Sequence, residues 1–461
     1  MVATLTELNK NKTKYFSVKL WLFRTVIVGV VLLLIAVILF YVNRGPQNTV
    51  SFNGVRKVTI QKENGRYSFY KDGKPFLVQG GSGNTYIKEL AAIGGNTIIC
   101  WDTSKLKETL TEAAKYNIAV IIGLDVPSGE QIAFYEDEKK ITALFNEYSN
   151  IVLRYKDNPS LFAWCLGNEL LMPFSLTTPP FYKSYNRLLS LIHQDDPHHP
   201  VATSTMNVAK RNIINIQWRI PALDFICINT YNRIKVIEED LNLIKRFWNG
   251  PYLISEWAPN GGWESEVTAW EAPIENTSTK KADQYHELFT KYMPVKDPRF
   301  LGSMAFYWGN RQEYTHTWYS IFLEDTPNEI KEVLNDCWKG TIMQHQSPRI
   351  LYSLIDNLGA KDNIILSPGS QHKASVLMET KNSTDILQFR WEILKEDWQF
   401  WGRTWSNFKK PLSEKGLLAD STLQNTSFTA PLKEGPYRVF VTVYNSKGYC
   451  ATANTPIYVV E

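Results

Sequence analysis

The segment LFAWCLGNELLMPF, residues 161–174, is the most informative stretch of this sequence. It opens with six apolar residues, a pattern typical of a strand buried on both faces, and continues to Asn168 and the charged Glu169. A buried carboxylate without a partner is costly, so Glu169 is expected either to have a partner or to take part in chemistry. The fold and the function therefore depend on what the rest of the chain brings to Glu169.

Seven further apolar runs are spread along the chain, and amphipathic stretches of helical period separate most of them. The eight predicted strands are residues 75–81, 96–101, 118–126, 161–169, 201–206, 223–231, 252–257 and 301–309. Strands that alternate with helices predict a parallel sheet, and eight such units within residues 53–340 fit a (β/α)₈ TIM barrel of class α/β. A doubly wound open sheet is the alternative. It is disfavoured because no G-x-G-x-x-G motif or P-loop follows any strand.

The N-terminal region predicts a membrane anchor. Residues 25–42, TVIVGVVLLLIAVILFYV, are uncharged and mostly apolar, and as a helix they rise about 27 Å, close to the thickness of a bilayer core. Five basic residues lie between positions 10 and 24, so the positive-inside rule predicts a cytoplasmic tail over residues 1–24 and an extracytoplasmic (periplasmic or extracellular) location for everything after the anchor. A cleaved signal peptide is the alternative, but the following FYVNRGPQ lacks a small-x-small cleavage site.

The texture of the sequence changes at about residue 347. Residues 347–461 are short, β-rich runs separated by turn sequences such as LSPGSQ, KEGP and NSKG. This pattern predicts an antiparallel, immunoglobulin-like β-sandwich. The sandwich could bind sugar or a partner, although a structural spacer packed on the barrel is the simpler interpretation.

Composition excludes several classes of protein. The net charge of +4 is mild and the sequence contains no basic stripe, so nucleic acid is not an expected partner. The five cysteines are widely spaced and form no CxxC pair, which argues against a disulfide framework and against a zinc site. We expect neither a metal nor a cofactor. The 15 tryptophans exceed what a core needs and leave some for a sugar-stacking surface.

A second glutamate stands at the end of a predicted strand. Glu256 closes the seventh run in YLISEWAPNGGW, as Glu169 closes the fourth. In a TIM barrel the C-terminal ends of the strands form the active site, so the two carboxylates should meet across the barrel mouth. Such a pair suits glycosidic bond cleavage, in which one protonated group donates to the leaving oxygen and one ionised group attacks the anomeric carbon. A salt-bridge role is the alternative for either glutamate alone.

WCLGNE and ISEW resemble the acid/base and nucleophile strands of the retaining glycosidases built on (β/α)₈ barrels. The resemblance is closest to the catalytic barrel of glycoside hydrolase family 2, and it extends over residues 65–340 through KDGKPFLVQGG, KDNPSLFAWCLGNE, INTYN and MAFYWG. It implies that Glu169 is the acid/base and Glu256 the nucleophile. It further implies that Asn168 binds the sugar 2-hydroxyl, Tyr231 hydrogen-bonds the nucleophile and Trp308 is a stacking platform.

Other aromatic residues are candidates for sugar subsites, although each could equally pack a loop. They are Trp101, Trp257, Trp263 and Trp318, and His316 is a further candidate for substrate contact. The sequence also departs from the family pattern. The family carries an arginine on the second strand that helps hold the nucleophile, and here Ile99 stands at that position.

Three functions follow from these features. The first is an anchored retaining β-glycosidase that acts on an extracytoplasmic oligo- or polysaccharide. The second is a β-glucan transglycosylase on the same site, in which aromatic loops hold an acceptor sugar. The third is a catalytically impaired barrel that binds polysaccharide within a synthesis or export complex, and Ile99 motivates it.

Overall fold

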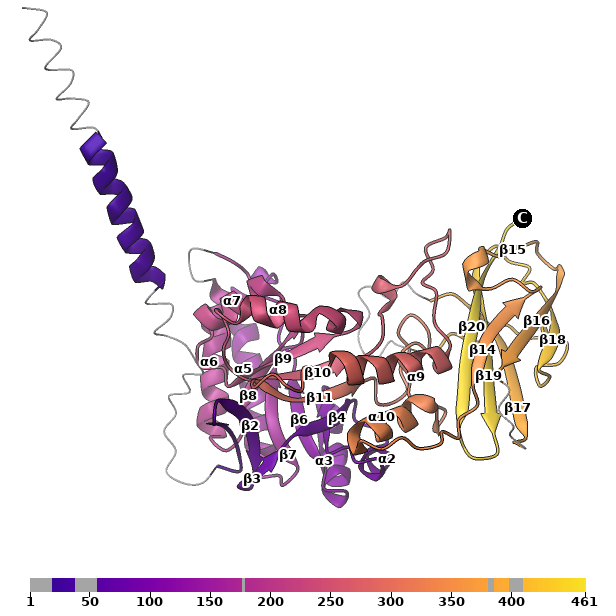
Figure 1. The fold of residues 1–461 in the computed structure, drawn as a ribbon, viewed down its shortest axis with the longest axis horizontal. Helices are drawn as coiled ribbons and strands as arrows, with labels where there is room; N and C mark the ends of the chain where they lie inside the picture. The colour runs from indigo at the N-terminus through magenta and orange to yellow at the C-terminus, as the bar shows by residue number, and fades with distance from the viewer. Residues whose placement is uncertain (1–18, 38–55, 176–178, 380–384, 398–408) are drawn as a thin grey trace, which may run out of the picture.

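The structure is a computed structural model that describes residues 19–37, 56–175, 179–379, 385–397 and 409–461. Its centre is a closed barrel of eight parallel strands, which confirms the predicted barrel (Figure 1). The strands are β4 (Val78–Ser82), β5 (Thr97–Cys100), β6 (Ala119–Leu124), β7 (Leu161–Leu166), β8 (Val201–Met206), β9 (Phe225–Thr230), β10 (Tyr252–Trp257) and β11 (Phe300–Phe306). Each overlaps one predicted run, and pairing of β11 with β4 closes the ring.

Helices follow most of the barrel strands and cover the outside. They are α2 (Ile87–Ala92), α3 (Leu106–Lys115), α4 (Ile132–Tyr135), α5 (Glu138–Tyr155), α6 (Pro180–Asp195), α7 (Lys210–Arg219), α8 (Ile237–Ile244), α9 (Ser278–Glu287) and α10 (Glu329–Lys339). Single turns η1 (Thr103–Lys105), η2 (Asn232–Val236), η3 (Gly262–Glu264) and η4 (Leu288–Tyr292) lie among them, as does the short hairpin β12 (Phe322–Leu323) and β13 (Thr326–Pro327). The longer helices bury one apolar face each, as their sequence period predicts.

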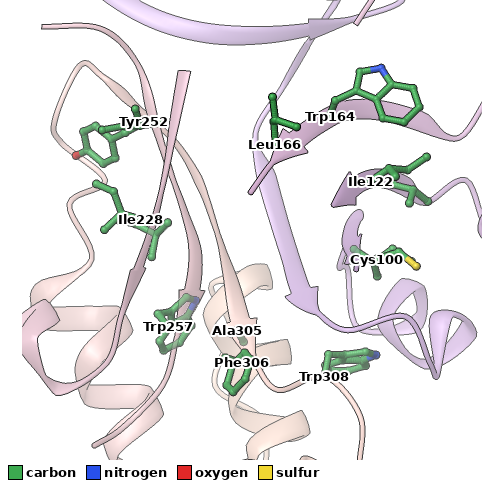
Figure 2. Close-up of a cluster of buried hydrophobic side chains, with 14 of the residues drawn as sticks. Cys100, Ile122, Trp164, Leu166, Ile228, Tyr252, Trp257, Ala305, Phe306 and Trp308 are labelled. Atoms are coloured by element: carbon green, nitrogen blue, oxygen red, sulfur yellow. The ribbon is translucent and has the colours of Figure 1, made fainter. Parts of the chain in front are cut away.

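The period-two alternation of the strands divides the barrel into two cores. Along β6, Ile121 belongs to the cluster inside the barrel, whereas Val120 and Ile122 belong to the larger cluster between the strands and the helices. Figure 2 shows part of this outer cluster, with Trp164, Trp257 and Trp308 among its buried side chains. The inner cluster is apolar at the level of Ile99.

An antiparallel sheet is packed against the inside of the barrel at one end. It consists of β1 (Val58–Glu63), β2 (Arg66–Lys71) and β3 (Lys74–Phe76), which leads into the start of β4. Phe69 of this sheet joins the inner cluster, with its ring centroid 4.8 Å from that of Phe162 near the start of β7. The sheet therefore closes the end where the strands begin and leaves the opposite end as the mouth.

The C-terminal region folds into two sheets with a common apolar core. One sheet has the order β14 (Ile350–Ile355), β16 (Gln371–Met378), β18 (Asn425–Thr429); the other has the order β15 (Ile365–Leu366), β20 (Cys450–Val459), β19 (Gly435–Asn445), β17 (Leu387–Lys395), with the turn η5 (Ala360–Asp362) nearby. The expected β-rich region is thus present, and its immunoglobulin-like character stays a prediction. Figure 1 shows it beside α9 and α10.

The N-terminal helix runs over Lys19–Val37 and is long and apolar enough to cross a membrane. Its side chains are exposed along its length. It begins before the predicted anchor, residues 25–42, and positions 38–42 lie outside the described residues, as does most of the predicted cytoplasmic tail. The helix is compatible with either a membrane span or a signal sequence.

Candidate active site

Glu169 lies three residues beyond the end of β7, in a turn at the barrel mouth. Gly167 and Glu169 both have left-handed backbone conformations, with φ of +82° and +49°, so the chain turns sharply as it leaves the strand. A non-glycine residue with positive φ is uncommon and marks a position that its surroundings hold in place. The backbone N–H of Glu169 donates to the hydroxyl of Ser204 on β8 at 3.3 Å, which fixes this turn to the neighbouring strand.

Glu256 lies within β10 and is only 7% exposed. The hydroxyl of Tyr231, directly after β9, donates a hydrogen bond to Glu256 Oε2 at 3.0 Å. The predicted contact between Tyr231 and Glu256 is therefore present. A phenolic donor stabilises the ionised form of a carboxylate and fixes its orientation, which is what a nucleophile requires.

Asn229, at the end of β9, connects the two glutamate positions. Its Nδ2 donates to Glu169 Oε1 and to Asn168 Oδ1, both at 3.1 Å. Its Oδ1 accepts from the hydroxyl of Ser255, the residue before Glu256, at 2.7 Å. Asn229 thus ties the strand that carries the nucleophile candidate to the turn that carries the acid/base candidate.

The side chain of Asn168 is oriented by its neighbours. Its Oδ1 accepts hydrogen bonds from Ser204 Oγ at 2.8 Å and from Asn229 Nδ2 at 3.1 Å. Because both bonds use the carbonyl oxygen, the amide Nδ2 is the group left to donate to a ligand. This orientation is compatible with the donor role that the sequence resemblance implies for Asn168.

The pKa values of both glutamates are raised above the ordinary value. Burial and the negative charge of Glu169 raise the pKa of Glu256, while Arg311 and the Tyr231 hydrogen bond oppose that rise. Burial and the negative charge of Glu313 raise the pKa of Glu169, and the hydrogen bond from Asn229 opposes it. Burial and like charge therefore both favour the protonated form of these two carboxyl groups.

The hydrogen-bond partners of the two glutamates differ. Glu256 accepts a hydrogen bond from the Tyr231 hydroxyl, and the positive charge of Arg311 acts on it. Both effects favour the ionised form of Glu256. Glu169 is half-buried in a turn, where a leaving group can reach it.

Two of the tryptophans predicted to contact sugar do not face the mouth. Trp257 is fully buried on the outside of the barrel against Tyr285 and Phe289, because strand alternation turns it away from the side that Glu256 occupies (Figure 2). Trp308 is also fully buried. It lies 5.1 Å from Phe322 and 6.4 Å from Trp338 by ring centroids, and its Nε1 donates to the carbonyl of Tyr86. The predicted platform role of Trp308 and the subsite role of Trp257 are therefore wrong.

Two other predicted tryptophans do lie at the mouth. The ring of Trp101, just after β5, covers Gly123 of β6 so closely that a Cβ at position 123 would stand 2.1 Å from Trp101 Cε3. Trp263 is 54% exposed, and its ring meets that of Tyr231 edge-on at 5.1 Å. The predicted sugar contacts of Trp101 and Trp263 stay predictions.

The remaining two aromatic candidates support the loop after β11. Trp318 is buried, and its Nε1 donates to the carbonyl of Asn260. His316 packs its ring 4.6 Å from Phe440 of β19, and burial lowers its pKa to about 3, so it is neutral. His316 therefore faces the C-terminal region, and its contact with substrate stays a prediction.

Four further residues near the two glutamates were not predicted from the sequence: Asn229, Phe306, Arg311 and Glu313. Phe306 ends β11, and its ring lies 5.7 Å from Tyr231 and 5.0 Å from Tyr319. Arg311 and Glu313, in the following loop, form an ion pair with little exposure. Only Asn229 had a signal in the sequence, since it precedes Thr230 and Tyr231 at the end of a predicted strand.

Ile99 occupies its predicted place on β5 and belongs to the apolar cluster inside the barrel. The positive charge expected at that position is therefore absent from β5, and among the described residues the guanidinium that acts on Glu256 is that of Arg311. Within the described residues no group of three or more His, Cys, Asp or Glu side chains could hold a metal ion. All five cysteines have free thiols.

No family model and no curated protein matches the chain. Among solved structures it is similar to an endo-β-1,4-mannanase from Thermotoga petrophila, at 14% identity and a TM-score of 0.39, over 85% of this chain and 99% of that one. It is also similar to β-glucuronidases from Bacteroides uniformis (13% identity, TM-score 0.47, 87% of this chain and 48% of that one) and Dictyoglomus thermophilum (18%, 0.47, 61% and 53%).

These neighbours are glycoside hydrolases, and the chain spans about half of the length of each β-glucuronidase. All three TM-scores lie below 0.5. The assignment of the barrel therefore depends on the strand pairing described above. Any inference about its chemistry depends on the side chains at the barrel mouth.

Proposed function

We propose that this chain is a retaining β-glycosidase that acts on a β-linked oligo- or polysaccharide outside the cytoplasmic membrane, to which the N-terminal helix anchors it. The observation that carries this proposal is the arrangement of Glu256 and Glu169 at the barrel mouth. Glu256 accepts a hydrogen bond from the Tyr231 hydroxyl, and Glu169 accepts one from the Asn229 side-chain amide. Two carboxylates with different hydrogen-bond partners suit the two chemical roles that glycoside cleavage needs.

In the first step Glu169 donates its proton to the glycosidic oxygen while the Glu256 carboxylate attacks the anomeric carbon. The leaving sugar departs as an alcohol, and a covalent glycosyl ester forms on Glu256. In the second step Glu169 takes a proton from water, the water oxygen attacks the anomeric carbon, and the Glu256 carboxylate leaves. Net configuration at the anomeric carbon is retained.

The surrounding groups support this sequence of events. Tyr231 holds Glu256 in one orientation, and Asn229 does the same for Glu169. The Nδ2 of Asn168 is the donor for the sugar 2-hydroxyl, a hydrogen bond that strengthens as the oxocarbenium ion develops. The surfaces of Trp101 and Trp263 suit the C–H face of a pyranose ring.

Transglycosylation on the same site is the second candidate. It is favoured by Trp263, which is 54% exposed beside Tyr231 and could hold an acceptor sugar where water would otherwise attack. Polysaccharide binding without turnover is the third candidate, and Ile99 favours it.

The test uses the full chain in detergent micelles with a panel of aryl β-glycosides and β-glucans, β-mannans and β-galactans, with products resolved by mass. We expect turnover that Glu256→Ala abolishes, and that Glu169→Gln lowers most for substrates with poor leaving groups. Shorter products support hydrolysis, and products longer than the substrate support transfer. Turnover that survives both substitutions would refute the two-glutamate mechanism, and binding without turnover would favour the third candidate.

A further inference from the structure

Three carboxylates come together at the barrel mouth, and their charges must be balanced. The negative charge of Glu313 acts on both Glu169 and Glu256 and raises the pKa of each. Three buried or half-buried carboxyl groups that act on one another resist ionisation unless a cation lies near them. Among the described residues Arg311 is the cation that acts on Glu256, and it forms an ion pair with Glu313.

Arg311 is held in place by aromatic rings and by its own loop. Its guanidinium lies 5.4 Å from the ring centroids of both Phe306 and Tyr307. Phe306 in turn contacts Tyr231, the donor to Glu256. The backbone N–H of Arg311 donates to the hydroxyl of Ser320 at 2.9 Å. A guanidinium stacked on aromatic faces loses little freedom when it orients toward an anion, so it acts as a fixed charge.

The loop that carries this ion pair is tied to a buried carboxylate. Glu313 and Thr315 exchange backbone hydrogen bonds of 3.0 and 2.8 Å. The hydroxyls of Thr315 and Thr317 donate to Glu275 Oε2 and Oε1 at 2.6 and 2.9 Å. Lys281 of α9 donates to Glu275 Oε1 at 2.8 Å, and its charge holds the pKa of Glu275 below its usual value. Glu275 therefore accepts hydrogen bonds from the loop and from α9, and Lys281 favours its ionised form.

The C-terminal region supplies a further hydrogen-bond donor to Glu275. Asn454 on β20 donates its Nδ2 to Glu275 Oε2 at 2.6 Å. The Oδ1 of Asn454 accepts from Arg438 on β19 at 2.8 Å, which fixes the amide so that its nitrogen faces Glu275. Arg438 also donates to the carbonyl of Pro273 and to Glu396, both within 2.8 Å. This buried network joins the C-terminal sandwich to the segment that contains Pro273 and Glu275.

We propose that Arg311 is a positioning residue that supplies the positive charge facing Glu256, and that the C-terminal sandwich holds it there through Asn454 and Glu275. The proposal rests on the glycosidase function above. It gives the sandwich a role in catalysis in place of that of a spacer. The structural relationship that carries it is continuous, from Asn454 through Glu275 and Thr315 to Glu313 and Arg311.

The test measures the pH dependence of kcat/KM for the full chain in micelles, on an aryl β-glycoside that the wild type hydrolyses. Arg311→Gln should move the acidic limb upward by on the order of one pH unit, because loss of a nearby cation favours the protonated form of Glu256. Arg311→Lys should restore part of the shift. The double variant Arg311→Gln, Glu313→Gln should shift the acidic limb less than Arg311→Gln alone. The second substitution removes a negative charge that raises the pKa of Glu256.

Two further variants test the role of the sandwich. Asn454→Leu removes the donor to Glu275 at nearly constant volume, and we expect a smaller upward shift of the same limb. The matched control is Arg390→Gln, which removes an exposed contact between the sandwich and Glu324 of the barrel and should leave the profile unchanged. A shift in Arg311→Gln and Asn454→Leu, with none in Arg390→Gln, is the expected result.

Other results would overturn the inference and leave the proposed function intact. If Arg311→Gln lowers kcat/KM equally at every pH and leaves the shape of the pH profile unchanged, the role of Arg311 is structural only. A higher KM with an unchanged pH profile would make it a substrate ligand. An Asn454→Leu profile identical to that of the wild type would separate the sandwich from catalysis. Failure of the function itself is recognised separately, since Glu256→Ala would then match the wild type on every substrate.

Discussion

Tyr231 and Glu256 come from neighbouring strands and meet through one hydrogen bond of 3.0 Å, with the phenol as donor. Both side chains are nearly excluded from solvent. Burial raises the pKa of the tyrosine far above its usual value, so it is protonated at every working pH and always able to donate. This bond is therefore a permanent source of stabilisation for the ionised form of Glu256.

Tyr231→Phe removes that donor and keeps the ring. A hydrogen bond to a charged group is worth about 1.5–3 kcal/mol, so kcat/KM should fall roughly 10- to 100-fold and the acidic limb of its pH profile should move upward. Steady-state kinetics between pH 4 and 9 would measure both effects. Tyr319→Phe is the control, since the Tyr319 hydroxyl makes no hydrogen bond to the described residues and its ring also contacts Tyr231. Equal losses in the two variants would contradict a specific role for the bond.

Glu256→Gln should make the stability of the protein less sensitive to pH. In the folded protein the pKa of Glu256 is raised to about 8, above the ordinary value that the unfolded chain retains. Ionised Glu256 therefore destabilises the fold; the cost is absent below about pH 4, grows as pH rises and is complete above about pH 8. Glutamine stays neutral, so the variant should be more stable than the wild type at pH 8 and equally stable at pH 4.

Thermal unfolding of the full chain at both pH values measures this difference. Glu313→Gln is a useful comparison, because it removes a carboxylate that is already paired with Arg311 and should not raise the melting temperature in the same way. A Glu256→Gln variant that is less stable than the wild type at pH 8 would mean that Glu256 is ionised and well compensated in the resting site.

Trp308 and Trp263 should respond oppositely to truncation. Trp308→Ala empties a fully buried site and should lower stability by about 3–5 kcal/mol. Trp263→Ala removes an exposed ring at the mouth and should cost at most about 1 kcal/mol of stability, while it raises KM for oligosaccharides. Melting temperatures and KM values for the two variants test this directly. An unchanged KM in Trp263→Ala would remove Trp263 from the binding surface.

Gly123→Ala should displace Trp101. The added methyl group would stand 2.1 Å from the indole, so the ring must leave the floor of the mouth. We expect a loss of activity and about 1–3 kcal/mol of stability. Gly359→Ala is the matched control, since the nearest atom to its new methyl group is 3.7 Å away and its backbone is extended. An active Gly123→Ala variant would show that catalysis does not need the Trp101 surface.

The barrel and its two glutamates were predictable from sequence because they depend on local patterns. Apolar runs at regular intervals predict the strands, and a charged residue at the end of a buried run predicts the mouth. Strand alternation could also have excluded Trp257, because it directly follows Glu256 and must face the opposite side. Trp308 could not be placed in this way, since the chain has left β11 two residues earlier.

Arg311 and Glu313 could not be predicted for a different reason. They lie in a loop whose path is set by contacts far away in sequence, among them Thr315 with Glu275 and Glu275 with Asn454. A periodic pattern carries no information about such contacts. The sequence pattern therefore shows only the missing cation at Ile99, while in the structure the charge of Arg311, in the loop after β11, acts on Glu256.

The most direct test of the two-glutamate account is covalent trapping of the nucleophile. The full chain in micelles would be incubated with a panel of 2-deoxy-2-fluoro β-glycosides that carry activated leaving groups, then digested and mapped by mass spectrometry. The account predicts one glycosyl ester, on Glu256, that forms with loss of activity and is absent from Glu256→Ala. An ester on Glu169 or Glu313, or no ester from the 2-fluoro analogue of a sugar whose aryl β-glycoside the protein hydrolyses, would contradict it.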